Sequence, residues 1–247
     1  MFSNDIKAIF FDLDGTLRHN DPSSMEAFYL FAAEEGFETT KEQQLLGKRW
    51  VNAYWAESEE LQQDLAQFGP WHDNGEFWIN HAHRHLVALG SPDGQAENLA
   101  LKVSQRMRAE YEAVDRVIPE VPDVLKKLRA AGFALAVVSN RSTPYDELME
   151  ALDLAQHFDF WLAAGEVGFF KPDPTVLHLA ADRAGVGADQ SVYVGDNYYA
   201  DVLAARAAGM HPVLYDPKGM YPEVDCVVIR DITHLEPLFL ACGDGDV

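Results

Sequence analysis

The sequence predicts an α/β fold, in which a parallel sheet has helices on both faces and a helical insertion follows its first strand. Two observations predict the sheet: short apolar runs recur along the chain, and helical patterns lie between most of them. A third observation predicts the insertion, because residues from about 18 to about 117 contain no convincing strand. We therefore expect a sheet-containing core from residues 1–17 and 118–247, and a helical unit from residues 18–117.

Six apolar runs bounded by polar residues are the expected strands. They are Ile6–Phe11, Phe133–Val138, Phe158–Ala164, Val192–Val194, Pro212–Tyr215 and Cys226–Ile229. Helices are expected where apolar residues recur at helical spacing and Pro or Gly marks an end. These helices are Pro122–Ala131, one that opens at Thr143–Pro144, Pro174–Ala184 and Tyr199–Ala208.

The insertion carries two apolar stripes at helical spacing. The stripes are Leu61, Leu65 and Phe68, and Leu99, Val103, Met107, Tyr111 and Val114. Four tryptophans in the insertion are expected to form mostly the core of a small helical bundle. They are Trp50, Trp55, Trp71 and Trp78. Histidines at 81, 83 and 85 suggest a metal tag, but no nearby acid or cysteine completes the ligand set, which favours ordinary helix histidines.

The charge balance excludes several classes of partner. The 247 residues include 19 Lys plus Arg and 40 Asp plus Glu, for a formal net charge of −21. Such acidity disfavours nucleic acids and anionic membranes as partners. The 48% of hydrophobic residues permit a sizeable core. With two cysteines, no membrane-length apolar run and no signal-peptide features, we expect a cytoplasmic protein.

The segment DLDGTL, residues 12–17, directly follows the first expected strand. Ligands bind at the carboxyl ends of strands in open parallel sheets, and side chains two apart on an extended segment share a face. Asp12 and Asp14 can therefore address one point, while Gly15 permits a sharp turn. An Asp-rich turn or a calcium loop is the simpler interpretation. However, an EF-hand loop needs further oxygen ligands, and this segment becomes hydrophobic instead.

A second acidic segment, residues 194–201, follows the expected strand Val192–Val194. Asp196 lies at the strand end, and Asp201 falls in the first turn of the next helix, where the helix dipole favours a carboxylate. Taken alone, Asp201 is more typical of a helix-capping acid than of a ligand. Together with Asp12 and Asp14, these residues form an all-oxygen set that suits Mg²⁺ rather than zinc.

Two further polar segments end strands or begin loops. Ser139 and Asn140 follow the strand Phe133–Val138 and could hold phosphate oxygens, although such a pair is most often a simple turn. Lys171 opens the loop KPDP, residues 171–174. A lone loop lysine is usually solvated, but here it would bring a positive charge to an acidic site and so help to bind phosphate.

Four motifs occur in order along the chain: DLDGTL at 12–17, VSN at 138–140, KPDP at 171–174, and VGD at 194–196 with a further acid at Asp201. In this order, each at an expected strand end or loop, they resemble the motifs of the haloacid dehalogenase superfamily. The resemblance covers nearly the whole chain. It implies a Rossmann-like core, and the position of the insertion between the first two motifs resembles members with an α-helical cap.

The resemblance also implies catalytic roles. Asp12 would be the nucleophile that forms an aspartyl-phosphate. Asp14 would protonate the leaving group as an acid and then activate water as a base. Ser139 and Lys171 would bind the phosphoryl group, with Asn140 beside them in the substrate site.

The metal ligands implied by the resemblance are Asp12, Asp196 and the backbone carbonyl of Asp14, supported by Asp201. The expected cofactor is Mg²⁺. Arg18, immediately after the first motif, is expected to bind a polar group of the substrate, and Arg141 to reach the leaving group.

Several other activities occur in the same superfamily. Dehalogenases generally lack the second acid of the first motif, so Asp14 favours phosphoryl transfer. Phosphonate hydrolases use an extra cap lysine, for which Lys41 and Lys48 are weak candidates. Phosphosugar mutases share all four motifs and are the leading alternative. A catalytically silent binding or regulatory member is the other alternative, which the retained acids and Lys171 argue against.

The sequence therefore predicts a Mg²⁺-dependent phosphatase that acts on a small phosphomonoester, as a monomer or homodimer. Residues 18–117 contain 9 Lys plus Arg and 17 Asp plus Glu, so they offer no basic track to a polyanion. A closing cap would also favour a substrate small enough to be enclosed. We expect a small phosphorylated metabolite rather than a nucleic acid, a membrane lipid or a phosphoprotein.

Overall fold

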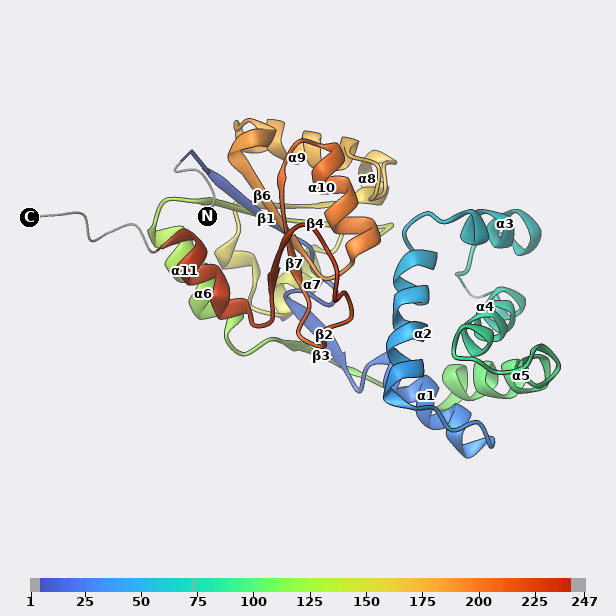
Figure 1. Cartoon of the computed structure of the whole chain (residues 1–247). Helices are drawn as coiled ribbons and strands as arrows, with labels where there is room; N and C mark the ends of the chain where they lie inside the picture. The colour runs from blue at the N-terminus through green and yellow to red at the C-terminus, as the bar shows by residue number, and fades with distance from the viewer. Residues whose placement is uncertain (1–4, 73, 241–247) are drawn as a thin grey trace, which may run out of the picture. The chain divides into compact units, whose positions relative to one another are not determined.

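The chain divides into two structural units, one built around a sheet and one helical (Figure 1). The structure is a computed structural model that describes residues 5–72 and 74–240. The sheet-containing core unit is Met1–His19 with Asp115–Val247, and the helical unit is Asn20–Val114. These limits lie close to the boundaries expected from the sequence. That the helical unit acts as a cap stays a prediction.

Six strands form the central sheet of the core unit, all paired in parallel. They are β1 (Ala8–Phe11), β4 (Ala134–Ser139), β5 (Phe160–Ala163), β6 (Ser191–Gly195), β7 (His211–Tyr215) and β8 (Val227–Ile229). The order across the sheet is β5-β4-β1-β6-β7-β8, so β1 lies between β4 and β6. Each strand coincides with one of the expected apolar runs, and the α/β prediction is confirmed.

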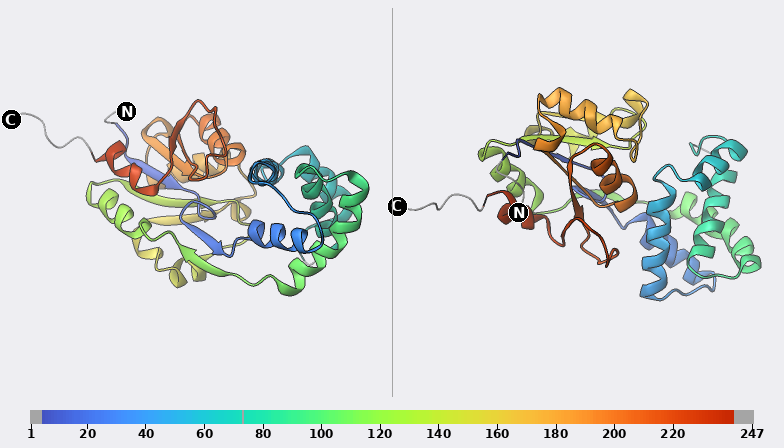
Figure 2. Two further views of the ribbon diagram at one scale, coloured as in Figure 1. Left: turned by 60° about the horizontal axis from the view of Figure 1, so that its bottom comes forward. Right: turned by 45° about the horizontal axis from the view of Figure 1, so that its top comes forward.

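Helices cover both faces of this sheet (Figure 2). Along β1, Ile9 and Phe11 point to one apolar cluster, whereas Ala8 and Phe10 point to the other. The first cluster includes residues of α6 (Val121–Ala130), α7 (Asp146–Ala151) and α11 (Leu235–Phe239). The second includes residues of α8 (Ala164–Val167), α9 (Thr175–Ala184) and α10 (Leu203–Ala207). Burial on both faces explains why the strands are continuous apolar runs.

Five helices make up the helical unit. They are α1 (Ser24–Glu34), α2 (Lys41–Tyr54), α3 (Glu59–Phe68), α4 (Gly75–Ala88) and α5 (Asp93–Glu110). Polar side chains at Ser23, Thr40, Ser58 and Asn74 cap the first four at their N-termini. One apolar cluster joins α1, α4 and α5, and a second contains three of the tryptophans, packed around Tyr54 and Phe77. Those tryptophans thus belong to the core of a bundle, as expected.

The expectation of no strand between residues 18 and 117 was wrong at both ends of the segment. β2 (Arg18–Asp21) and β3 (Val114–Val117) pair in a separate two-stranded sheet. Their sequences, RHND and VDRV, lack the apolar alternation that marks a half-buried strand, so the pattern gave no signal. The expected apolar stripe from Leu99 to Val114 is also shorter than predicted. Its helix, α5, ends at Glu110, and Val114 lies exposed on β3.

Two helix starts also differ from expectation. α7 begins at Asp146 rather than at Thr143, because Tyr145 has a non-helical backbone and buries its ring in the core. The helix expected from Tyr199 begins as a π-helical turn, Tyr198–Val202, before α10. Short 3₁₀ turns lie at Ala155–His157, Ala188–Gln190 and Ile232–His234. In residues 5–72 and 74–240, no helix is long and apolar enough to cross a bilayer.

Candidate active site

Three neighbouring strands of the core unit end close together. Asp12 directly follows β1, Ser139 is the last residue of β4, and Asp196 directly follows β6. Because parallel strands end at the same edge of a sheet and β1 lies between β4 and β6, the loops after them converge. The backbone N–H of Asp12 donates a 2.8 Å hydrogen bond to the carbonyl of Val194 and fixes the first loop against β6.

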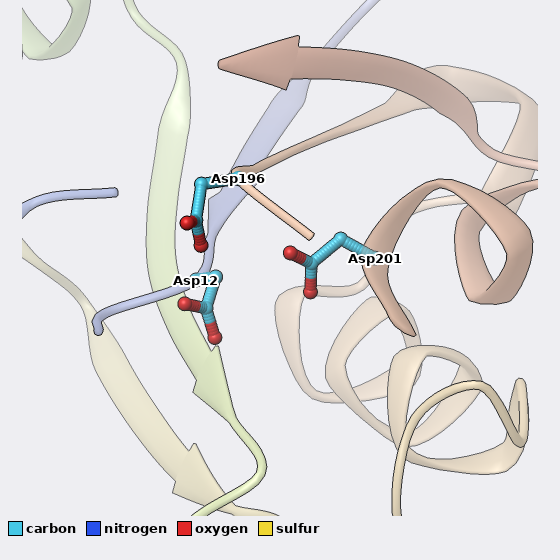
Figure 3. Close-up of side chains that lie close together, drawn as sticks. All are labelled: Asp12, Asp196 and Asp201. Carbon is cyan, nitrogen blue, oxygen red and sulfur yellow. The ribbon is translucent and has the colours of Figure 1, made fainter. Parts of the chain in front are cut away.

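Asp12, Asp196 and Asp201 form an acidic cluster at this edge (Figure 3). One carboxylate oxygen of each lies within 4.8 Å of the others. Two glycines make the approach possible. A Cβ on Gly15 would lie 2.6 Å from the Asp196 carboxylate, and one on Gly195 would overlap the Asp201 carboxyl group. The glycines of both motifs therefore leave the space that the acids occupy.

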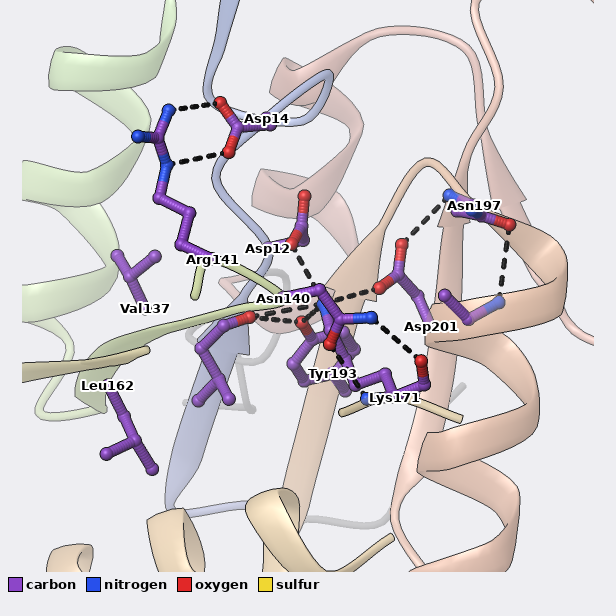
Figure 4. A network of polar contacts seen from close by, with 12 residues as sticks. Asp12, Asp14, Val137, Asn140, Arg141, Leu162, Lys171, Tyr193, Asn197 and Asp201 are labelled. Atoms are coloured by element: carbon purple, nitrogen blue, oxygen red, sulfur yellow. Dashed lines mark hydrogen bonds and ion pairs between the residues drawn. The ribbon is translucent and has the colours of Figure 1, made fainter. Parts of the chain in front are cut away.

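Lys171 lies at the centre of the polar network around this cluster (Figure 4). Its Nζ is 2.8 Å from Asp12 Oδ1, 2.7 Å from Asp201 Oδ1 and 2.6 Å from Tyr193 Oη. The carbonyl oxygen of Val138 is a fourth acceptor at 3.2 Å. The lysine is 1% exposed. Sequence analysis expected it at the site, and the structure places its ammonium directly on Asp12.

Burial and charge act in opposite directions in this network. Burial raises the pKa of the Asp12 carboxyl above its ordinary value; Lys171 opposes the shift, and the nearby acids Asp201, Asp14 and Asp196 add to it. Burial also acts against the charged form of Lys171, but Asp12 and Asp201 outweigh it and raise the pKa of the ammonium. The network therefore favours the charged form of Lys171, whereas burial disfavours the charged form of Asp12.

Asn140 holds the loop that carries Lys171. Its Nδ2 donates a 2.8 Å hydrogen bond to the Lys171 carbonyl, and its Oδ1 accepts a 2.7 Å bond from the Lys171 N–H. The side-chain amide thus orients the lysine backbone from the end of β4. Ser139, the preceding residue, is 2% exposed at the same strand end. Substrate binding by Ser139 and Asn140 stays a prediction.

The Asp14 carboxylate is engaged by two arginines. Arg141 donates from Nε to Oδ2 and from Nη2 to Oδ1, both at 2.9 Å (Figure 4). Arg18, which is 7% exposed, forms ion pairs with Asp14 and with Asp115. Burial alone would raise the pKa of Asp14, but the two arginines outweigh it and lower that pKa. Arg18 and Arg141 thus contact the proposed acid in this structure, and their roles toward a substrate stay predictions.

Sequence analysis missed two residues of the network. Tyr193 lies in β6, accepts a hydrogen bond from Lys171 and donates one of 2.6 Å to the Val138 carbonyl. Asn197 caps the π-helical turn, and its N–H donates a 2.9 Å bond to Asp201 Oδ2. The sequence did offer a signal for Tyr193, because a tyrosine inside a buried strand needs a hydrogen-bond partner for its hydroxyl. Asn197 had no such signal beyond its place before a helix.

The acidic cluster fits a hard divalent cation. Its donor atoms are all carboxylate oxygens, which Mg²⁺ prefers, and it contains no thiolate or imidazole. Because Gly15 and Gly195 have no side chain, these oxygens have room to lie close together although like charges repel. Within residues 5–72 and 74–240, this is the one group of three or more acid, histidine or cysteine side chains with converging ligand atoms.

This arrangement of motifs can be compared with known families. Residues 6–209 match the family model of haloacid dehalogenase-like hydrolases. The chain belongs to this family. The resemblance inferred from the four motifs is thereby confirmed.

Relatives within the haloacid dehalogenase-like family include both phosphatases and dehalogenases. The chain is 29% identical to haloacid dehalogenase-like hydrolase domain-containing protein 3 of Bos taurus, over 91% of this chain and 89% of the relative. It is 30% identical to phosphoglycolate phosphatase of Escherichia coli K12, over 83% and 79% respectively. A solved 2-haloacid dehalogenase from Pseudomonas syringae pv. Tomato DC3000 is 26% identical, with a TM-score of 0.53 over 96% of this chain and 98% of that one.

The three histidines of the helical unit form no converging ligand set. His81 and His85 are buried on α4, where burial lowers their pKa values to about 4 and about 3. His83 points elsewhere and lies 3.0 Å from Asp93. A metal tag at these positions is therefore not seen in the described part of this haloacid dehalogenase-like chain.

Proposed function

We propose that this hydrolase is a Mg²⁺-dependent phosphatase that cleaves a small phosphomonoester through an aspartyl-phosphate on Asp12. The observation that carries the proposal is that one loop holds two acids with different partners. Asp12 contacts the buried ammonium of Lys171, while Asp14, two residues further on, is held apart by Arg141. A nucleophile and a separate acid–base group are what a two-step phosphoryl transfer requires.

In the first step, an Asp12 carboxylate oxygen forms a bond to phosphorus as the bond from phosphorus to the ester oxygen breaks. The arginines that pair with Asp14 lower its pKa, so Asp14 must leave Arg18 and Arg141 and take up a proton when substrate binds. It then gives that proton to the departing oxygen. In the second step, Asp14 takes a proton from a water molecule. The hydroxide oxygen that remains attacks phosphorus and displaces the Asp12 carboxylate. Inorganic phosphate leaves, and both acids return to their starting forms.

Charge is the main barrier to the first step, because a carboxylate must approach a phosphate dianion. The Lys171 ammonium, 2.8 Å from Asp12 Oδ1, offsets part of this repulsion. Asp12, Asp196, Asp201 and the Asp14 backbone carbonyl would hold Mg²⁺, which when bound neutralises phosphoryl oxygens. Ser139 would bind another phosphoryl oxygen from the end of β4.

A small phosphorylated metabolite is the proposed substrate. A relative that is 30% identical carries the name phosphoglycolate phosphatase, which supports a small phosphomonoester for this chain. The net charge of −21 also disfavours polyanionic substrates. We extend the proposal to a cytoplasmic monomer or homodimer with the helical unit as a cap over the site.

Phosphate release tests the proposal. We expect the wild-type protein with Mg²⁺ to release inorganic phosphate from at least one of a panel of sugar phosphates, nucleotides and phosphoglycolate. Asp12→Asn should lower turnover about 10³-fold or more, because it removes the nucleophile. The control is Asp182→Asn, which changes an exposed acid on α9 and should leave turnover unchanged.

Two outcomes would contradict the proposal. Near wild-type turnover by Asp12→Asn would exclude this nucleophile. Isomerisation of a sugar phosphate that depends on a bisphosphate, with no net phosphate release, would instead identify a phosphosugar mutase.

A further inference from the structure

The helical unit contains a cavity of its own, of about 470 Å³. Its lining comes from α1, α2, α4 and α5 and the residues that end α2 and α5. Sites for small organic molecules typically measure about 300 to 1,000 Å³. All of its lining residues lie between Ser24 and Tyr111, within the helical unit.

The walls of the cavity are largely apolar and aromatic. They include Phe28 of α1, Trp55 at the end of α2, Trp78 of α4 and Met107 of α5. The ring centroids of Trp55 and Trp78 lie 5.9 Å apart, and Trp78 is 39% exposed although it is large and apolar. Such walls bind water weakly, so a flat apolar molecule is the better occupant.

Two buried imidazoles also line the cavity and add no charge to it. His81 and His85 have pKa values lowered by burial, which keeps both rings neutral near pH 7. The buried Nε2 atom of each has no hydrogen-bond partner in the described structure. These two side chains therefore add hydrogen-bonding capacity to the wall without adding charge.

One cation, Arg108 of α5, also belongs to the lining. Its neighbour Arg106 forms ion pairs with Glu34 and Glu110 at 2.6 and 2.8 Å. Arg108 is exposed and forms no ion pair or hydrogen bond with any residue in the described ranges. Among the described residues, an arginine that no acid contacts is notable in a chain that has 40 acids and 19 bases. It gives the cavity a positive group that an anion can complement.

We propose that this cavity binds a small organic anion with a flat apolar body, its ring among Phe28, Trp55 and Trp78 and its anionic group on Arg108. The apolar and aromatic walls favour a flat ring, and the Arg108 guanidinium, which no described residue pairs with, favours an anionic group. The observations behind the site come from the helical unit alone, so ligand binding there can be tested whether or not the phosphatase proposal holds.

Calorimetric titration with naphthalene-2-carboxylate tests the site, with the neutral 2-naphthamide as the matched probe. We expect the carboxylate to bind the wild-type protein more tightly than the amide. Arg108→Gln should weaken carboxylate binding tenfold or more and leave amide binding unchanged. Arg106→Gln is the matched control, since Arg106 lies on the same helix outside the lining, and it should leave both affinities unchanged. Thermal unfolding checks that all three proteins are folded.

Two results would overturn the site. One is the absence of carboxylate binding at millimolar concentration to the folded wild-type protein. The other is an equal loss of affinity in Arg108→Gln and Arg106→Gln, which would show a general charge effect.

The ligand has two possible sources, the organic part of a substrate or a separate metabolite. A carboxylate that raises KM for a phosphate ester without changing kcat indicates the first source. A carboxylate that binds without changing either constant indicates the second. Both results support the site.

Discussion

At the scale of single residues, the Lys171 ammonium is shared among more acceptors than it has protons. It has three N–H donors and four acceptors within 3.2 Å: two carboxylates, one hydroxyl and one carbonyl. The Tyr193 hydroxyl gives its own proton to the Val138 carbonyl, so its lone pairs face the lysine. Tyr193 therefore acts as a positioning residue that keeps the ammonium on Asp12.

Tyr193→Phe should lower kcat about tenfold or more while changing KM little, because a hydrogen bond to a charged group is worth about 1.5 to 3 kcal/mol. The ring and its packing remain. Tyr145→Phe is the matched control: its buried hydroxyl also donates to carbonyls of the sheet, at Val137 and Leu162, but does not contact Lys171. Steady-state kinetics and melting temperatures of both variants separate the effects. An unchanged kcat in Tyr193→Phe would remove the positioning role.

The positions of the acids in the proposed active site were predictable from the sequence, whereas the polar network around them was not. Asp12 and Asp196 follow apolar runs, and the rule that parallel strands end at one edge was enough to bring them together. The two hydrogen bonds that hold the Asp14 carboxylate come from Arg141, which lies 127 residues away in sequence. No spacing rule predicts which arginine reaches which acid across such a distance.

At the scale of elements, α4 carries a pH-sensitive pair into the core of the helical unit. His81 packs among rings of Trp50, Tyr54 and Trp55, and His85 stacks on Phe28 at 4.3 Å. Burial is the largest cause of the lowered pKa of His81, and the negative charge of Asp64 opposes that shift. The packing of α4 among these rings therefore favours the neutral form of both imidazoles.

Acidification should destabilise the helical unit. The unfolded chain binds protons at these imidazoles near pH 6.5, but the folded unit binds them only near pH 4 and pH 3. Between pH 6.5 and 4 the unfolded state thus carries more protons, and the free energy of unfolding falls as pH decreases. The limiting slope is about 1.4 kcal/mol per pH unit for each histidine.

Tryptophan fluorescence measures this unfolding, because four of the five tryptophans lie in the helical unit. Many carboxylates also titrate, so the comparison is between wild type and His85→Phe, which should show a shallower loss of stability between pH 6.5 and 4. His83→Gln, on the same helix but paired with Asp93 outside this cluster, is the control and should keep the wild-type slope. Identical slopes in wild type and His85→Phe would contradict the role of the buried ring.

Element prediction succeeded where burial produces a simple pattern. The six central strands are buried on both faces, so their apolar runs were visible in the sequence. β2 and β3 have four residues each and lie outside the central sheet, and neither shows apolar alternation, so no pattern marked them. The start of α7 was misplaced because Tyr145 takes a core position that local capping signals do not describe.

At the scale of the whole molecule, the proposed active site and the proposed ligand cavity belong to different structural units. The core unit holds the acidic cluster and Lys171, whereas the helical unit holds the aromatic cavity. The division into two units was visible in the sequence as a break in the rhythm of strands and helices. The cavity was not, because its wall residues also satisfy the pattern of an ordinary bundle core.

The most direct test of the central claim is to find the phosphate on Asp12. Asp14→Asn lacks the base that activates water, so it should accumulate the aspartyl-phosphate from an ester with a good leaving group, such as p-nitrophenyl phosphate. Acid quenching followed by peptide mass spectrometry should detect phosphate on Asp12 with Mg²⁺ present and none with EDTA, because the proposed mechanism needs Mg²⁺ at the acidic cluster. Phosphate release by the wild-type protein without any phosphorylated Asp12 in this variant would contradict the mechanism.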